Sequence, residues 1–242
     1  MASSRPREAP RGDDGDEVLQ LRESPLWRMA GTVAVTAGSL IALAQLGQLA
    51  TYDRADVVAS LADPFFRAFS IAYAAAFVAL MLALVALYMR QARAGGTFGL
   101  LGFGAAVLGT MCLGANMWFE AFCSPWLLEA APTLLTAEKA VIWQIGYLSS
   151  YATFALGWML FGISCLRARV YPTVACVAVV LGGAIGFFAA QPPFGVPLGL
   201  AVAALGAWLW RSDRAASAAS AVPQPAQPGA GVPEPRWPGP RT

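Results

Sequence analysis

Long apolar runs dominate this chain of 242 residues and limit it to a small set of folds. A helix needs about 20 mainly apolar residues to cross a bilayer. Apolar runs lie in six places, near 29–50, 67–89, 98–119, 141–165, 173–190 and 195–210, the last two being the shortest. Charged residues make up only 12% of the chain, against about 25% in an ordinary soluble domain. The sequence therefore predicts an all-α, polytopic membrane protein with six transmembrane helices.

The distribution of arginine predicts how these helices are oriented. Arginines are frequent in the N-terminal segment, in the connections near residues 90 and 168, and after residue 210, whereas the other connections hold only Arg54, Arg67 and Lys139. Because basic residues favour the cytoplasmic side of a membrane, we expect both termini in the cytoplasm. The first apolar run lacks a small-residue cleavage site, so we expect a retained anchor in a bacterial plasma (inner) membrane.

The two ends of the chain differ in composition from its centre. Residues 1–26 are charged and interrupted by proline and glycine, and residues 212–242 are rich in alanine and proline. Segments of such composition seldom bury enough apolar surface to fold. We therefore expect a disordered cytoplasmic N-terminal tail at 1–26, a six-helix transmembrane domain at 27–211 and a disordered cytoplasmic tail at 212–242.

Several residue types that enzymes commonly use are missing. The chain contains no histidine, which removes the usual ligand sets for zinc, haem and copper. Lys139 is the only lysine, and the sequence has neither a phosphate-binding loop nor a G-x-S-x-G serine motif. We therefore expect no cofactor, no metal site and no nucleotide or nucleic-acid partner, whereas the oligomeric state stays open.

Polar and aromatic side chains concentrate in the half of the bundle that is predicted to face outward. Amides and phenols seldom face lipid, so these side chains should converge on the bundle interior. They predict an outward-opening pocket among the first four helices, lined by Gln45, Gln48, Tyr73, Trp118, Phe122, Gln144, Tyr147 and Tyr151. For Gln45 and Gln48, hydrogen bonds that bridge helices are an equally good interpretation.

Glu120 stands out in this set because a carboxylate at the end of an apolar run is costly. It lies either in the headgroup layer or inside the bundle, one helical turn beyond Asn116 and with Arg67 as its candidate counter-ion. Paired with Arg67, it would remain ionised and serve the architecture. Unpaired among aromatic side chains, it would be a candidate catalytic acid with Asn116 and Arg67 beside it.

The two long outward connections hold further residues that allow two interpretations. Asp53, Asp56 and Asp63 are candidate partners for a buried acid, although aspartates in a loop are more often turn formers. Residues 125–132 are typical of a short amphipathic helix at the membrane interface. Trp143 fits the belt of aromatic residues at that interface.

Three G-x-x-x-G pairs, at 95/99, 182/186 and 195/199, predict close contacts between helices. Helices in lipid are held together by packing rather than by hydrophobic expulsion, so small residues let their backbones approach. We interpret the three pairs as packing faces within the chain rather than as a dimer interface.

The motifs WFEAF at 118–122, LGWMLFG at 156–162 and PPFGVPLGL at 192–200 resemble those of small six-helix actinobacterial membrane proteins of unassigned function. That resemblance covers residues 27–210 and implies the fold without an activity. The chain also resembles small integral-membrane terpene cyclases in size, helix count, lack of nucleotide motifs and use of embedded acids among aromatic residues. Those enzymes protonate an alkene or epoxide with a carboxylic acid, which implies Glu120 as the acid.

Three functions follow from these observations and remain open. The first is a non-catalytic membrane protein whose outward pocket binds a hydrophobic molecule, a lipid or a partner. The second is a membrane-embedded, acid-initiated terpenoid (meroterpenoid) cyclase of secondary metabolism that uses Glu120 as its proton donor. The third is a small transporter or exporter, which the weak repeat symmetry and the scarcity of charge in the inner half disfavour.

Overall fold

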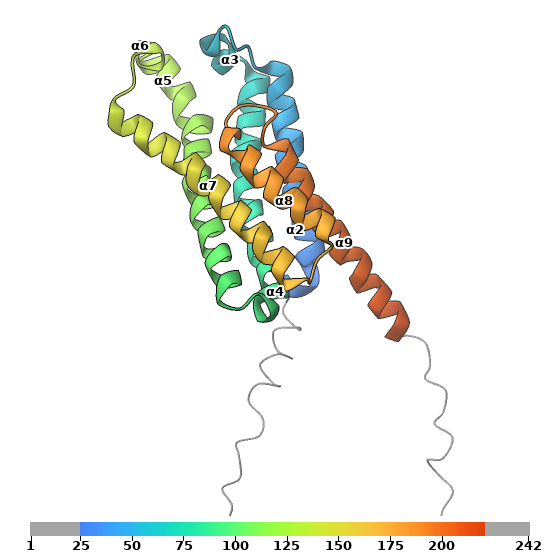
Figure 1. Ribbon diagram of the computed structural model, residues 1–242. Coiled ribbons are helices and arrows are strands. Elements are labelled where there is room, and N and C mark those ends of the chain that lie inside the picture. The colour runs from blue at the N-terminus through green and yellow to red at the C-terminus, as the bar shows by residue number, and fades with distance from the viewer. Residues whose placement is uncertain (1–24, 221–242) are drawn as a thin grey trace, which may run out of the picture.

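The computed structural model describes residues 25–220, and every regular element in that range is helical. In chain order these are α2 (Pro25–Thr51), α3 (Val57–Ala62), α4 (Pro64–Trp118), the π-helical turn η1 (Phe119–Cys123), α5 (Ser124–Ala130), α6 (Thr133–Thr136), α7 (Val141–Ala168), α8 (Thr173–Ile185), the 3-10 turn η2 (Gly186–Phe188) and α9 (Val196–Ser220). The long helices lie side by side, and the short helices α3, α5 and α6 gather at one end of the bundle (Figure 1). The expected all-α architecture is confirmed.

Three helical stretches are long and apolar enough to cross a membrane. They are Trp27–Thr51, Pro64–Ala130 and Val141–Ala168, and the apolar stretch Thr173–Phe188 is shorter. The apolar runs that we expected at 67–89 and 98–119 therefore lie within one continuous stretch, and the expected runs at 173–190 and 195–210 correspond to α8 with η2 and to α9.

Helix α4 reverses direction at Gly96, where φ is 53° and ψ is −152°. Only glycine adopts this combination readily, because it has no Cβ to clash with its own backbone. The two arms of α4 then pack antiparallel: the rings of Tyr88 and Phe103 stack at 4.2 Å, and a Cβ on Gly114 would lie 3.2 Å from the Cβ of Phe77. The turn explains how a single stretch of 67 residues can occupy two positions in the bundle.

Small residues bring the long helices into backbone contact. A Cβ on Gly38 would lie 2.2 Å from the carbonyl oxygen of Gly199, which presses α2 against α9. A Cβ on Gly182 would lie 2.7 Å from the Cα of Leu198, so the predicted close contacts at 182/186 and 195/199 are confirmed. The prediction for 95/99 is wrong, because a Cβ at either position would meet nothing within 4 Å. These two glycines flank the reversal of α4 instead of a packed face.

The first and last long helices extend beyond residues 27 and 211. Helix α2 begins at Pro25, and α9 continues to Ser220, past the expected end of the helical domain at 211. The remaining parts of the two predicted tails, residues 1–24 and 221–242, lie outside the described residues. The start of α2, the reversal of α4 and the C-terminal end of α9 lie at the end of the bundle opposite α3, α5 and α6 (Figure 1).

Candidate functional site

A cavity of about 810 Å³ opens at the end of the bundle that carries the short helices. We call it the Glu120 cavity. Its wall combines leucine and aromatic side chains with a few polar groups and is formed by Gln48, Tyr52, Val57, Leu61, Phe66, Ser70, Ala115, Asn116, Phe119, Glu120, Ser124, Leu127, Leu134, Leu135, Lys139, Trp143, Gly146, Tyr147, Ala190, Gln191 and Pro192. Helices α2 to α7 and the segment after η2 all contribute, so the cavity depends on the whole end of the bundle.

The carboxylate of Glu120 faces this cavity from the π-helical turn η1. A π-helical turn inserts one extra residue into a helix and is frequent at functional sites. Oε1 of Glu120 accepts a hydrogen bond from the Tyr147 hydroxyl at 3.3 Å, a long contact that restrains the carboxylate weakly. Oε2 receives no hydrogen bond from the described residues, and the side chain is partly exposed within the cavity. Oε2 is therefore open to a ligand.

Asn116 lies one helical turn before Glu120 and links α4 to α7. Its Nδ2 donates to the Ser150 hydroxyl, which in turn donates to the carbonyl oxygen of Tyr147 at 2.7 Å. This chain of hydrogen bonds holds the Tyr147 backbone on α7 against α4. Asn116 and Tyr147 both line the cavity together with Glu120.

Gln48 contributes the third polar group on the wall. Its Nε2 donates to the Ser70 hydroxyl at 3.1 Å, and its Oε1 accepts from Nε2 of Gln45 at 3.2 Å. Gln45 itself is fully buried below the cavity. Gln48 therefore presents a fixed amide to the cavity, whereas Gln45 has no access to it.

Gln45 and Tyr73 hold the segment that follows η2. Gln45 donates to the carbonyl oxygen of Ala189 at 3.0 Å and accepts from the backbone N–H of Gly195 at 3.1 Å. The Tyr73 hydroxyl donates to the same carbonyl at 3.0 Å. For Gln45 the alternative interpretation, hydrogen bonding between elements, is correct. Both side chains support the cavity wall at 190–192 without lining it.

Four other predicted residues lie away from the cavity. No ion pair joins Arg67 to Glu120 within residues 25–220; Arg67 does not line the cavity, and its Nε is buried without a hydrogen-bond partner. Gln144 is exposed and donates to the carbonyl oxygen of Lys139 at 3.0 Å. Trp118 and Phe122 are 56% and 44% exposed, with their rings 4.4 Å apart on the outside of the bundle.

Helical phase explains why Trp118 and Phe122 lie on the outside of the bundle. Successive helical residues are about 100° apart, so Trp118 and Phe122 share one face and Glu120 lies near the opposite one. Tyr151 is 3% exposed and packs below Tyr147, with ring centroids 4.7 Å apart, so it lies behind the wall. The aromatic lining beside Glu120 comes instead from Phe119 and Tyr147.

Lys139 is a wall residue that the sequence analysis missed. Its Nζ donates to the carbonyl oxygens of Leu134 at 2.6 Å, Leu135 at 3.1 Å and Ala137 at 3.2 Å, so it caps the C-terminal end of α6. The signal was present, since this is the only lysine of the chain and lies in the long connection that the sequence predicts to face outward.

Trp143 and the aspartates of the first connection each had two possible roles, and their contacts show which role applies. Trp143 lines the cavity and stacks on Tyr147 at 4.8 Å while remaining 43% exposed. Asp56 caps α3 by accepting from the backbone N–H of Ala59, and Asp63 caps α4. The aspartates are therefore turn and cap formers, and Glu120 is the only carboxylate among the residues that line the cavity.

Among the described residues, no group of three histidine, cysteine, aspartate or glutamate side chains could hold a metal ion. The site offers one carboxylate and one lysine ammonium, with the phenols, amides and serine hydroxyls of the wall, beside an apolar volume. Comparison with protein-family models, with curated proteins and with solved structures finds no match for the chain.

Proposed function

We propose that this protein spans the plasma membrane with six helices, both termini in the cytoplasm, and that the Glu120 cavity opens outward. Each arm of α4 exceeds the about 20 residues that a span requires, and α2 and α7 supply two more spans. We assign the last two to the shorter apolar stretch Thr173–Phe188 and to α9. The concentration of arginine at the end opposite Glu120 supports this orientation.

The function that we propose is the binding of an amphipathic small molecule in the Glu120 cavity. The observation that carries it is the cavity of about 810 Å³, which lies within the roughly 300–1,000 Å³ typical of small-molecule sites. Leu127, Leu134 and Leu135 supply an apolar wall for the hydrophobic body. Oε2 of Glu120 and Oδ1 of Asn116 can accept from a hydroxyl or an ammonium group, and the remaining N–H of Asn116 can donate to a hydroxyl.

A set of long-chain probes tests the proposal. The purified full chain is heated in detergent with an alkyl amine, an alcohol or a carboxylic acid of equal chain length, and the unfolding temperature is recorded. The amine and the alcohol should raise it, because the carboxylate can accept a hydrogen bond from either. The alkyl acid should raise it less, because its carboxylate would be repelled by Glu120 and because the Lys139 ammonium on the same wall already donates to three carbonyl oxygens.

A pair of glycine variants tests whether the cavity itself is the binding site. Gly146 lines the cavity, and a Cβ there would meet no atom within 4 Å, so Gly146→Leu adds volume where space is open. Gly104 on α4 is equally unobstructed but does not line the cavity, which makes Gly104→Leu the matched control. Gly146→Leu should abolish the amine effect and Gly104→Leu should keep it. Equal responses of both variants would refute binding in the Glu120 cavity.

A second candidate function is acid-initiated cyclisation of a terpenoid. The observation that favours it is the position of Glu120, which faces an apolar volume beside Phe119 and Tyr147 and has no cationic partner within the described residues. In such a reaction the protonated carboxyl group gives its proton to an epoxide oxygen, the C–O bond opens, and an alkene attacks the resulting cation. Loss of a proton from the final cation yields the product and can restore the acid.

The cyclase is distinguished from a binding protein by turnover. An epoxidised farnesyl phenol is incubated with the reconstituted protein, and a product of unchanged mass but altered retention is sought. Wild type should form it, and Glu120→Gln should lose it while keeping the affinity for the unreacted probe. Glu129→Gln, which changes an exposed carboxylate on α5, is the control. If Glu120→Gln forms the product at the wild-type rate, Glu120 is not the acid.

A further inference from the structure

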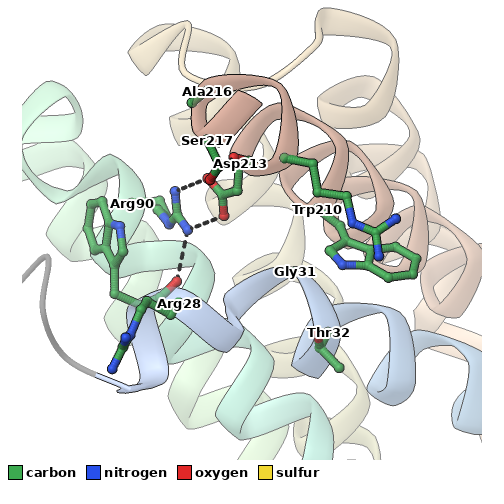
Figure 2. Close-up of a pocket in the computed structure, with 10 residues that line it drawn as sticks. Arg28, Gly31, Thr32, Arg90, Trp210, Asp213, Ala216 and Ser217 are labelled. Atoms are coloured by element: carbon green, nitrogen blue, oxygen red, sulfur yellow. Dashed lines mark hydrogen bonds and ion pairs between the residues drawn. The ribbon is translucent and has the colours of Figure 1, made fainter. Parts of the chain in front are cut away.

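A second cavity, of about 690 Å³, lies at the end of the bundle opposite Glu120. Its wall includes Trp27 and Arg28 from α2, Arg90 from α4, and Trp210, Asp213 and Arg214 from α9. We call it the Arg90 cavity. Figure 2 shows Arg28 and Trp210 on either side of a central pair formed by Arg90 and Asp213.

The central pair is fixed by several hydrogen bonds. Nη1 and Nη2 of Arg90 donate to the two carboxylate oxygens of Asp213 at 2.9 and 2.6 Å, and Nη2 also donates to the carbonyl oxygen of Trp27 at 2.8 Å. Such a two-point contact between guanidinium and carboxylate is strong and directional. Arg90 therefore joins α2, α4 and α9, and the charge of Asp213 is already neutralised.

Two positive charges remain on the wall after this pairing. Arg28 and Arg214 are exposed, and neither forms an ion pair with another residue between 25 and 220. The guanidinium of Arg214 lies 4.0 Å from the centre of the Trp210 ring, which positions it without neutralising it. The cavity therefore carries a net positive charge, and the fixed Arg90–Asp213 pair lies at its centre. This combination favours the binding of an anion.

The position of the cavity indicates which anion. At a rise of about 1.5 Å per residue, the arm from Pro64 to Arg90 covers roughly 39 Å, more than the hydrocarbon thickness of a bilayer. Arg90 therefore lies near the membrane surface opposite Glu120. Tryptophan is enriched at that depth, and Trp27 and Trp210 flank the cavity. Basic pockets between helices at the cytoplasmic surface are suited to the headgroups of anionic lipids.

We propose that the Arg90 cavity binds the headgroup of an anionic phospholipid, whose phosphate is attracted by Arg28 on one side of the Arg90–Asp213 pair and by Arg214 on the other. The lipid would bridge the start of α2 and the C-terminal part of α9. Thr32 lines the same cavity and adds a hydroxyl to its wall.

The test compares phosphatidylglycerol, phosphatidylcholine and inorganic phosphate as probes of the full-length protein in detergent. Bound lipid is counted by native mass spectrometry. Wild type should retain phosphatidylglycerol in preference to phosphatidylcholine, and added salt should weaken the retention. Arg28→Gln with Arg214→Gln should lower the affinity for phosphatidylglycerol by roughly tenfold or more. Circular dichroism confirms that the variant is folded.

A charge-matched variant supplies the control. Arg93 and Arg211 are exposed arginines that do not line the cavity, so Arg93→Gln with Arg211→Gln should change the affinity by less than about twofold. Equal weakening in both double variants would overturn the proposal, because it would indicate attraction to the general surface charge. Equal retention of the two lipids would also overturn it. Stabilisation by inorganic phosphate alone, equal to that by phosphatidylglycerol, would assign the cavity to free phosphate instead.

Discussion

Arg90 and Glu120, the central charged residues of the two cavities, differ in how they are paired. In the Arg90 cavity, the buried guanidinium is matched by a carboxylate on a neighbouring helix and joins three helices. In the Glu120 cavity, the carboxylate has one weak hydrogen bond from Tyr147 and no ion pair within the described residues. A paired charge stabilises the fold, and an unpaired charge is available to a ligand. The comparison therefore separates a structural charge from a functional one.

The largest effect on stability should come from Arg90→Gln. The substitution removes three charge-assisted hydrogen bonds and leaves Asp213 without its partner. Breaking a well-buried pair costs about 3–5 kcal/mol, and because the Asp213 side chain is 41% exposed we expect a loss of about 2–3 kcal/mol. The free energy of unfolding in mixed micelles measures it. Arg93→Gln, an exposed arginine of the same helix, should change it by less than about 0.5 kcal/mol.

A loss of about 2 kcal/mol is expected for Gln45→Leu. The leucine has a similar volume but leaves the buried backbone N–H of Gly195 without its acceptor at 3.1 Å. The same unfolding measurement applies. Gln144→Leu is the matched control, since its amide is exposed and contacts only the carbonyl oxygen of Lys139. If both glutamines prove equally replaceable, the supporting role assigned to Gln45 is wrong.

A smaller effect, about 1 kcal/mol, should follow from Tyr171→Phe, because the Tyr171 hydroxyl donates to the carbonyl oxygen of Leu87 at 2.7 Å. Burial raises the pKa of the Tyr171 phenol well above its ordinary value. A raised pKa means that the protonated form is favoured by folding, so this contribution is complete below the unfolded pKa near 10 and declines as the pH rises above it. The difference in stability between wild type and Tyr171→Phe should therefore shrink in strongly alkaline solution.

The apolar runs predicted most of the fold, because burial in lipid or protein demands the same residue types over the length of a helix. They could not predict that the runs at 67–89 and 98–119 form one apolar stretch. That depends on a single backbone conformation at Gly96. Similarly, the composition of 212–220 resembles a disordered tail, yet α9 continues through it to Ser220.

The site was predictable only in part. Spacing along one helix placed Asn116 near Glu120, and the interior preference of amides and phenols placed Gln48 and Tyr147 on the same cavity. Trp118 and Phe122 were wrongly expected to line the pocket. Helical phase places them on the face of the helix that lies away from Glu120. The predicted pairing of Arg67 with Glu120 rested only on their similar depth in the membrane. Depth does not determine the face of a helix on which a side chain lies.

The Arg90 cavity was missed for a different reason. Its arginines served in the sequence analysis only to count charge on each side of the membrane. The pairing of Arg90 with Asp213 joins residues far apart in the sequence, and Asp213 falls within the segment that was expected to be a tail. No local pattern marks such a contact, so only the packing of α2, α4 and α9 could reveal it.

The smallest effect on stability, and the sharpest test of the contrast between the two ends, should come from Glu120→Gln. The amide oxygen can accept the hydrogen bond from Tyr147 as the carboxylate does, and no cation loses a partner among the residues described. We expect the free energy of unfolding to change by less than about 0.5 kcal/mol. Binding of the alkyl amine should nevertheless be lost, because its ammonium group needs the negative charge.

Asp213→Asn provides the opposite pattern. It removes a carboxylate from the other end and should weaken the fold by about 1–2 kcal/mol, because Arg90 then lacks a charged acceptor. Amine binding at the Glu120 cavity should be unaffected in the variant, because the two cavities lie at opposite ends of the bundle. If Glu120→Gln destabilised the protein as much as Asp213→Asn does, Glu120 would be a structural charge after all. The distinction between the two ends would then disappear.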